Sequence, residues 1–376
     1  MFKFSLVIIG CQFNYYDAQK LANSLVRLGG LETDVDTADL IIILACSVRQ
    51  KAADRILGFI RNYRKSLHNP KVIVTACVLE ADRPKIVARA DYVCDSPYLN
   101  RHLATILEEL KIDHSPTSDC VLPALSHQLF NDKTAYLTIT SGCNNFCTYC
   151  AVPYTRGREI SKSSKEIIEE AKTLVKNGIS HIILLGQNVN SFGLSNYHPR
   201  DLRKNTDQDG QMWSIEHPSP ITVLLRQLEQ INGLERISFL SPNPQDMSDD
   251  LIDWMHNSDT FSKELNLPMQ SGSTAILKKM NRRYTQREYL RLVRKIRQAV
   301  PDIWLSTDII VGFPGETLQN FEQTVKVVKI CRFNKAFIGI YSPRPGTVSA
   351  KTMPDNISPD EKKRRFKILN EMVNKQ

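Results

Sequence analysis

Three cysteines lie close together in the run Ser-Gly-Cys-Asn-Asn-Phe-Cys-Thr-Tyr-Cys, at Cys143, Cys147 and Cys150. Thiolates with this Cys-x3-Cys-x2-Cys spacing can bind three irons of a cubane cluster and leave the fourth iron without a protein ligand. An iron with an open position can bind and reduce a small molecule, so the spacing indicates catalysis rather than electron storage. Zinc or unrelated thiols are the alternatives. Structural zinc, however, uses four closed ligands, and no fourth Cys or His is close in sequence.

The N-terminal third contains three short apolar runs, over residues 4–10, 40–45 and 71–76. These runs are rich in Ile and Val and lack strict alternation, which is typical of parallel strands covered on both faces. Amphipathic stretches such as residues 17–28 separate them. Alternation of strands and helices predicts an α/β unit with a doubly wound parallel sheet over residues 1–115.

Three more cysteines, Cys11, Cys46 and Cys77, each come directly after one of those strands. Because the carboxyl ends of parallel strands meet at one edge of an open sheet, where ligands bind, these thiols should converge on a second cluster site. Packing as small apolar fillers is the alternative for each of them. Cys94, after a weaker strand, is the main rival ligand, and we interpret Cys120 and Cys331 as structural.

The rest of the chain shows six apolar runs with helical patterns between them, over residues 136–140, 181–185, 236–240, 265–269, 304–311 and 336–341. Six repeats are too few for a closed eight-stranded barrel and predict an open (β/α)6 partial barrel. Chemistry then belongs to the loops after the strands, and the cysteine triplet follows the first. We expect a linker at 116–133, the barrel at 134–365, a tail at 366–376, and an exposed insertion at 194–220.

Bulk composition narrows the class of protein. Apolar residues make up 42% and charged residues 24%, as in a globular protein. No apolar run reaches the ~18 residues of a membrane span and no signal-peptide pattern is present, so we expect a cytoplasmic protein with reduced thiols. Residues 1–130 carry 15 basic and 14 acidic side chains, and the remainder carries 34 and 26. The basic remainder favours a polyanionic partner, with an ordinary solvated surface as the alternative.

Several segments together resemble the methylthiotransferase family of radical S-adenosylmethionine (SAM) enzymes, most closely the MiaB group, which acts on tRNA. The resemblance covers nearly the whole chain. The triplet itself resembles the radical SAM motif. The segments are GCQFNYYDAQ (10–19), ACSVRQKA (45–52), TACVLEADRP (75–84), SGCNNFCTYCAVPYTRGRE (141–159), LLGQNVNSFG (184–193), LPMQSGSTAILKKMNRRYT (267–285), TDIIVGFPGET (307–317) and YSPRPGT (341–347).

The resemblance implies a mechanism. Cys143, Cys147 and Cys150 would hold the 4Fe-4S cluster that reductively cleaves S-adenosyl-L-methionine to a radical, which removes hydrogen from C2 of an adenine. Cys11, Cys46 and Cys77 would hold an auxiliary 4Fe-4S cluster that carries the sulfur, and a second SAM would methylate it. The unactivated C2 position requires such cofactor-borne chemistry. The implied product is 2-methylthio-N6-(dimethylallyl)adenosine at position 37 of tRNA.

Other polar residues are candidates for contacts. We predict that SAM is contacted by Tyr149, Gln187, Gln270 and Asp308, with loop capping as the alternative. Phosphate contacts of the tRNA anticodon loop are assigned to Arg156, Arg158, Arg282 and Arg283, because arginine suits bidentate phosphate binding; surface ion pairing is the alternative. Gly312, Gly315 and Glu316 in the run VGFPGET indicate a tight turn. The basic run 362–365 is interpreted as a solvated helix face.

The chain departs from the family's pattern in three ways, and two other functions are alternatives to the one that the resemblance implies. Ala45 and Ala76 stand where the family commonly has Thr and Gly, and the chain ends before the small RNA-binding β-barrel (TRAM domain) that relatives usually carry. The rivals are a methylthiotransferase for threonylcarbamoyladenosine of tRNA or for a ribosomal protein, and a non-catalytic iron–sulfur or RNA-binding remnant. Besides tRNA, the expected partners are an external electron donor and a sulfur source, with no membrane and a monomeric state.

Overall fold

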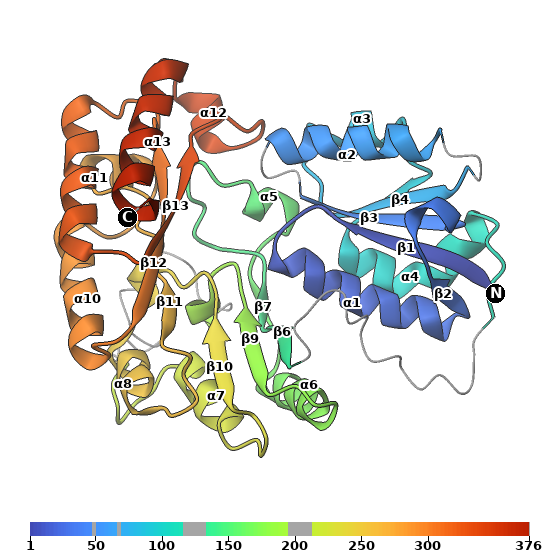
Figure 1. Cartoon of the computed structure of the whole chain (residues 1–376), viewed down its shortest axis with the longest axis horizontal. Coiled ribbons are helices and arrows are strands. Elements are labelled where there is room, and N and C mark those ends of the chain that lie inside the picture. The colour runs from blue at the N-terminus through green and yellow to red at the C-terminus, as the bar shows by residue number, and fades with distance from the viewer. Residues whose placement is uncertain (47–49, 66–68, 116–132, 195–212, 376) are drawn as a thin grey trace. The chain divides into compact units, whose positions relative to one another are not determined.

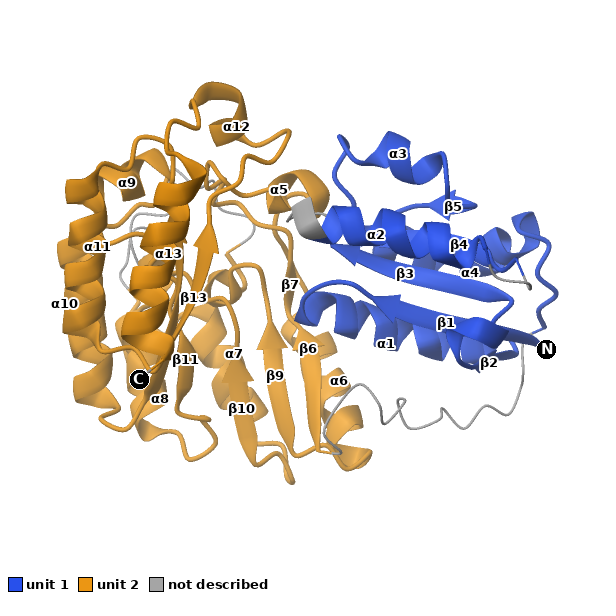
Figure 2. Cartoon of the chain, turned by 45° about the horizontal axis from the view of Figure 1, so that its top comes forward, with its two compact units in different colours: residues 1–132 blue, residues 133–376 orange. Residues whose placement is uncertain are grey.

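The computed structural model describes residues 1–46, 50–65, 69–115, 133–194 and 213–375. It divides the chain into two compact units, residues 1–132 and 133–376 (Figure 2). The predicted linker falls almost wholly outside the described residues, as does most of the predicted insertion. None of the helices in the described ranges combines the length and the apolar character that a membrane crossing requires.

The first unit is built on a parallel sheet in the order β2-β1-β3-β4-β5. The strands are β1 (Phe2–Ile8), β2 (Gly30–Glu32), β3 (Leu40–Cys46), β4 (Lys71–Cys77) and β5 (Tyr92–Val93). Helices α1 (Gln12–Arg27) and α4 (Ser96–Glu109) cover one face, and α2 (Gln50–Tyr63) and α3 (Arg83–Val87) cover the other (Figure 1). The predicted doubly wound sheet is confirmed.

Strand β3 shows why this sheet is covered on both faces. Leu40 and Ile42 pack into the apolar cluster formed with α1 and α4, whereas Ile41 and Ile43 pack into the cluster formed with α2 and α3. All four side chains are fully buried. A strand buried on both faces gains apolar burial at every position, which explains the unbroken run Leu-Ile-Ile-Ile-Leu.

The second unit holds six parallel strands, paired as β10-β9-β6 and β11-β12-β13. An isolated parallel bridge from Ile237 to Phe261 lies between these two groups. The strands are β6 (Thr134–Thr138), β9 (His181–Leu185), β10 (Arg236–Phe239), β11 (Glu264–Asn266), β12 (Trp304–Val311) and β13 (Lys335–Ile340). Each boundary lies within a few residues of the predicted run, and the open six-stranded barrel is confirmed.

Helices cover the outer face of the barrel strands (Figure 1). They include α6 (Ser164–Lys176), α7 (Pro220–Leu228), α8 (Asp249–Asn257), α10 (Gln286–Ala299), α11 (Leu318–Cys331) and α13 (Pro359–Asn374). The expected tail over 366–376 is instead largely the second half of α13. Leu369 is fully buried and Phe366 packs against the barrel core, so apolar burial extends the helix through these positions.

The basic run 362–365 is not a uniformly solvated face, which corrects that expectation. Lys362 and Arg365 are 5% and 4% exposed. The Lys362 ammonium donates to Asp355 and to the Tyr341 carbonyl, and the Arg365 guanidinium donates to the Glu316 carboxylate at 2.7 Å and carbonyl at 2.8 Å. Both side chains face the barrel because buried anionic and carbonyl oxygens there need donors.

Replacing Arg365 with alanine should lower the free energy of unfolding by about 3–5 kcal/mol, because Glu316 would remain as a buried and uncompensated charge. Chemical denaturation of the apoprotein measures this change. Arg364→Ala is the matched control, since Arg364 is an exposed neighbour that pairs only with Glu361 in the described contacts. That control should cost less than about 1 kcal/mol, and equal losses for the two variants would contradict the assignment.

Ala76 has a backbone φ of +79°, in a region that disfavours any side chain with a Cβ. Ala76→Gly should therefore raise the free energy of unfolding by about 0.5–1 kcal/mol, the relieved strain minus the greater unfolded-state entropy of glycine. The matched control is Ala45→Gly, at the register partner of Ala76 in β3. There glycine should destabilise by a similar amount. A loss of stability in both variants would show that Ala76 is unstrained.

Candidate functional site

The cysteine triplet lies on the loop that follows β6. A short antiparallel pair, β7 (Thr140–Ser141) with β8 (Ile160–Ser161), closes this loop at its base. Gly142 has φ +80°, and a Cβ at this position would lie 2.1 Å from the Arg158 carbonyl oxygen. Only glycine fits there, which explains the Ser-Gly-Cys sequence that turns the chain into the loop. The loop ends in α5 (Val152–Thr155).

The three thiols lie close together in partly desolvated surroundings. Cys143 and Cys147 are buried, with 9% and 8% of their surface exposed, and Cys150 is half-buried. Burial, with a smaller contribution from the Cys147 thiol, raises the pKa of the Cys143 thiol to about 11 and that of Cys150 to about 12. Thiols so disfavoured as free thiolates gain when cationic iron neutralises them.

Nitrogen donors point at two of the sulfurs. Asn145 Nδ2 lies 3.6 Å from Cys143 Sγ, and Arg282 Nη1 lies 3.5 Å from Cys147 Sγ. In the described residues, no three Cys, His, Asp or Glu side chains converge as the ligands of a single metal ion do. Each of three cysteines on a cubane cluster binds a different iron, so the loop with its donors fits a 4Fe-4S cluster.

A second segment, residues 279–282, is distant from the cysteine loop in sequence but is hydrogen-bonded to it. Thr148 donates from its backbone nitrogen to the Met280 carbonyl at 3.1 Å and from its hydroxyl to the Lys279 carbonyl at 2.9 Å. Asn281 Nδ2 donates to the carbonyls of Asn145 and Phe146 at 3.0 and 3.1 Å. We call residues 279–282 the clamp segment. It begins at the last residue of α9 (Thr274–Lys279), and nothing in the sequence indicates its contact with the loop.

Behind the loop lies a small polar cavity at the carboxyl ends of β6, β9 and β10. Glu159 is 6% exposed, and both of its carboxylate oxygens accept from the Ser191 hydroxyl at 2.7 Å. The Asp246 carboxylate accepts from Asn188 Nδ2 at 2.7 Å. Burial raises the pKa of Glu159 to about 8 and also raises the pKa of Asp246. The cavity walls are completed by Asn144, Asn145, Leu194, Gln245 and Arg283.

Buried acceptors remain around this cavity. Oε1 of Gln187 and Oδ1 of Asn188 have no hydrogen-bond partner among the residues that the structure describes. Unpaired buried oxygens carry an energetic cost unless a donor arrives, so the cavity suits a ligand with N–H groups or positive charge. Glu159 and Asn188 were inside motifs singled out above, whereas Asp246 gave no signal in the sequence.

Of the four residues predicted to contact SAM, Tyr149, Gln187 and Gln270 follow barrel strands, whereas Asp308 lies within β12. Gln187 follows β9, and Tyr149 packs against the apolar cluster of Met280, Phe313 and Tyr341. Gln270, with φ +63°, donates from its backbone nitrogen to the carbonyl of Asp308 at 2.7 Å. The structure therefore brings Gln270 and Asp308 together, while their role toward SAM stays a prediction.

The predicted phosphate-binding arginines occupy different settings. Arg158 is exposed and its guanidinium carbon lies 4.3 Å from the centre of the Phe146 ring. Arg156 follows α5, and exposed Arg283 lines the polar cavity. Arg282 instead points at Cys147. A phosphate contact of any of the four stays a prediction.

The auxiliary cysteines follow three adjacent strands. Cys46 and Cys77 are register partners at the ends of β3 and β4, and Cys11 is the N-cap of α1, two residues after Ile9, which donates to Leu44. Buried Asn14 donates to the carbonyls of Leu44 and Ala45, which fixes the start of α1 against the end of β3. Three thiols at one sheet edge fit a second cluster, as the sequence predicted.

Cys94, the rival ligand, packs into the apolar cluster beneath the sheet with Leu99 and Leu103. Burial raises its thiol pKa to about 12. Cys331 is likewise buried in the barrel core. Cys120 lies outside the described residues.

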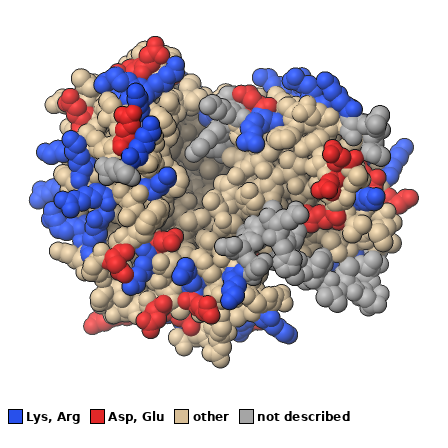
Figure 3. All heavy atoms as spheres, in the orientation of Figure 1, with Lys and Arg blue, Asp and Glu red and all other residues tan. Residues whose placement is uncertain are grey.

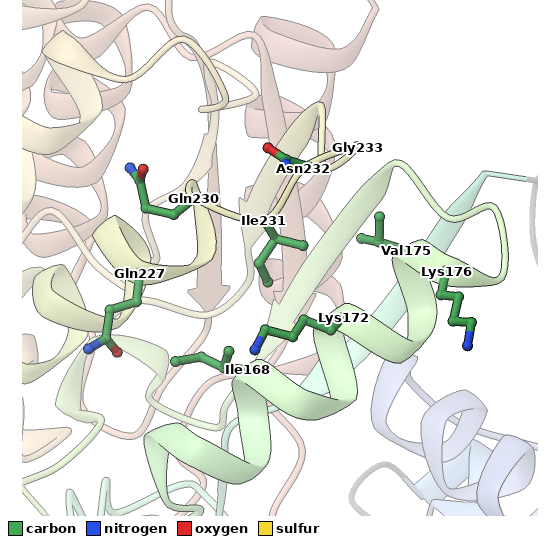
Figure 4. Close-up of a pocket in the computed structure, with 9 residues that line it drawn as sticks. All are labelled: Ile168, Lys172, Val175, Lys176, Gln227, Gln230, Ile231, Asn232 and Gly233. Carbon is green, nitrogen blue, oxygen red and sulfur yellow. The ribbon is translucent and has the colours of Figure 1, made fainter.

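Two other grooves contain no cysteine. One of about 700 Å³ lies between α6 and the end of α7 and is lined by Ile168, Val175 and Ile231 together with Lys172 and Lys176 (Figure 4). The segments that line this groove precede β9 and β10, so the groove lies at the amino ends of these strands, whereas the cysteine loop follows the carboxyl end of β6. The other, of about 500 Å³, lies in the first unit between the ends of α2 and α3 and is lined by Arg61, Arg64, Lys65 and Arg89. Figure 3 shows basic side chains gathered over these helices.

Residues 137–328 match the Radical SAM superfamily, and residues 3–95 match an uncharacterized protein family, UPF0004. The fold is similar to that of the radical S-adenosylmethionine methyltransferase TsrM from Kitasatospora setae. The TM-score is 0.64 and the identity 14%, with 93% of this chain and 77% of that chain covered. The radical enzyme OxsB gives a TM-score of 0.57 at 12% identity over 100% of this chain and 56% of that one.

Relatives of known name are much closer in sequence. The tRNA-2-methylthio-N(6)-dimethylallyladenosine synthase of Lachnoclostridium phytofermentans is 37% identical over 97% of this chain and 79% of its own length. The synthase of Thermoanaerobacter sp. (strain X514) is 39% identical over 97% and 76%. That of Yersinia pseudotuberculosis (serotype O:3, strain YPIII) is 37% identical over 98% and 76%. The chain therefore belongs to the tRNA-2-methylthio-N(6)-dimethylallyladenosine synthase family of radical SAM enzymes.

Proposed function

We propose that this protein methylthiolates N6-(dimethylallyl)adenosine at position 37 of tRNA and gives 2-methylthio-N6-(dimethylallyl)adenosine. The observation that carries the proposal is the presence of two cysteine triplets, each at the carboxyl edge of a parallel strand system, in a chain 37–39% identical to such synthases. One triplet suits radical generation and the other suits delivery of sulfur. The enzyme is a radical SAM transferase, and its cofactors are two 4Fe-4S clusters and SAM.

Cys143, Cys147 and Cys150 would hold the cluster with one iron open to SAM, and this group supplies the electron that cleaves SAM into a carbon radical. Cys11, Cys46 and Cys77 would hold the cluster that supplies sulfur. The chain's own contribution is orientation: Gly142 and the clamp segment fix the loop, and Asn14 fixes the auxiliary edge. An external reductant and an external sulfur source complete the reaction, because cleavage consumes an electron and each product removes a sulfur atom.

The polar cavity would hold the methionine end of SAM. That end carries an ammonium group beside the sulfonium. Its positive charge would favour the ionised forms of Glu159 and Asp246, which burial alone disfavours, and the resulting carboxylates would accept its N–H groups. The unpartnered oxygens of Gln187 and Asn188 would accept its remaining N–H groups. Gln270, Asp308 and Tyr149 lie on or after other barrel strands and would contact the nucleoside part.

The tRNA would be held by basic side chains around the cysteine loop and on the first unit. Arg156, Arg158 and Arg283 are the candidates near the loop, and the groove lined by Arg61, Lys65 and Arg89 is the candidate on the first unit. Arginine and lysine neutralise phosphates without reading sequence, so these contacts position the RNA rather than select the base.

Iron content tests the cluster assignment. Anaerobically reconstituted protein should bind about eight irons, the sum for two 4Fe-4S clusters, and either cysteine triplet changed to alanine should leave about four. The variant Cys11→Ala/Cys46→Ala/Cys77→Ala should still cleave SAM but give no methylthio product on dimethylallylated tRNA, as read by mass spectrometry of the digested RNA.

Cys94→Ala is the matched control for that measurement and should retain about eight irons. A drop to about four in this variant would make Cys94 a ligand. Wild-type protein that cleaves SAM with two full clusters yet leaves dimethylallylated tRNA unmodified would contradict the proposed function. Parallel reactions with threonylcarbamoylated tRNA and a ribosomal protein would then identify the substrate.

SAM affinity tests the polar cavity. Glu159→Gln and Asp246→Asn keep the side-chain shape but cannot ionise when the ammonium group binds. Each should therefore weaken SAM binding about tenfold or more, because a charge-assisted hydrogen bond contributes about 1.5–3 kcal/mol. Equilibrium binding to the reconstituted protein measures this. Glu170→Gln, on the outer helix α6, is the control and should bind SAM normally. Unchanged affinity in both cavity variants would place the methionine end elsewhere.

A further inference from the structure

Arg282 is held beside the cluster loop by three hydrogen bonds from its guanidinium. Nη1 donates to Cys147 Sγ at 3.5 Å, Nε donates to the Tyr284 hydroxyl at 3.1 Å, and Nη2 donates to the Pro268 carbonyl at 3.4 Å. Its guanidinium carbon also lies 5.1 Å from the centre of the Tyr284 ring, within cation–π range. The positive charge therefore has a fixed position against a cysteine ligand.

The partners of Arg282 are themselves immobilised. The buried Tyr284 hydroxyl donates to the carbonyls of Pro268 and Met269 at 3.1 and 3.0 Å. The next residue, Thr285, caps α10 by accepting from the Glu288 backbone nitrogen at 3.2 Å. On the other side, Asn281 is hydrogen-bonded to the cysteine loop. A guanidinium fixed from both sides is pre-organised for the sulfur and is poorly placed to reach out to an RNA phosphate.

Charge placed at this point acts selectively on one redox state. Reduction adds a negative charge to an iron–sulfur cluster, and part of that charge resides on the cysteine sulfurs. Hydrogen bonds and cations at the sulfurs stabilise the reduced state more than the oxidised state and so raise the reduction potential. Asn145 provides a neutral donor to Cys143, whereas Arg282 adds a full charge at Cys147.

We propose that Arg282 is a positioning residue that raises the reduction potential of the cluster held by Cys143, Cys147 and Cys150, through its charge and its hydrogen bond to Cys147. The inference deepens the proposed function and rests on its assignment of this triplet. It replaces phosphate binding as the leading role for Arg282. A purely structural role, in which the side chain only anchors the loop, predicts a different outcome in the experiment below.

The experiment compares three full-length proteins that all carry Cys11→Ala/Cys46→Ala/Cys77→Ala, so that only the cluster of the other triplet gives a signal. One protein keeps Arg282, one carries Arg282→Met and one carries Arg282→Lys. Iron content and the midpoint potential are measured, the latter by redox titration followed by electron paramagnetic resonance. Arg282→Met should lower the ratio of reduced to oxidised cluster at a fixed potential about tenfold, which corresponds to a shift of about 59 mV for one electron. Arg282→Lys should retain most of the wild-type ratio.

The matched control is Arg287→Met, which removes an equal charge from an exposed position on α10. It should leave the ratio unchanged. Loss of iron in Arg282→Met with a normal cluster in Arg282→Lys would also support a requirement for charge. An intact cluster with an unshifted potential in Arg282→Met, or equal defects in the Met and Lys variants, would overturn the inference. Because no tRNA is present, an Arg282-dependent potential in a protein that fails to methylthiolate tRNA would refute only the proposed function.

Discussion

The second unit depends on one constraint: sulfur atoms that must carry negative charge are held inside a protein loop that has no regular structure of its own. Burial raises the pKa of Cys143 and Cys150 far above neutrality. Unsupported thiolates in such a place would be costly, so the surrounding elements supply what the loop lacks. The clamp segment binds its backbone, Asn145 and Arg282 point donors at its sulfurs, and Gly142 permits the turn that leads into it.

The same principle organises the polar residues elsewhere in the barrel. Glu316 closes the turn after β12 by accepting from the Gly312 backbone nitrogen at 2.7 Å, and Arg365 of α13 neutralises it from outside. Glu159 is tied to Ser191, and Asp246 is tied to Asn188. The first two charges compensate one another and are structural. The Glu159 and Asp246 carboxyls instead line a cavity, together with Arg283, and are therefore available to a ligand.

Sequence periodicity predicted the architecture well because short apolar runs separated by amphipathic stretches are typical of alternating strands and helices. The central strand β3 is buried along nearly its whole length, which explains its unbroken apolar run. The positions of Cys11, Cys46 and Cys77 followed from the rule that parallel strands share a carboxyl edge. What sequence could not reveal depends on contacts between distant segments. Asp246 carries no local signal, Arg282 is indistinguishable in sequence from a phosphate-binding arginine, and Lys362 and Arg365 look solvated until α13 is placed against the barrel.

The clamp segment also has a consequence for the order in which the protein matures. Its hydrogen bonds to the cysteine loop join residues 131–136 positions apart. Contacts of such long separation form late, after the intervening strands have paired. During synthesis the three thiols therefore emerge well before the segment that shelters them. Until the clamp segment reaches the loop, the thiols are more open to oxidants, so the growing chain is more vulnerable to oxygen than the folded apoprotein.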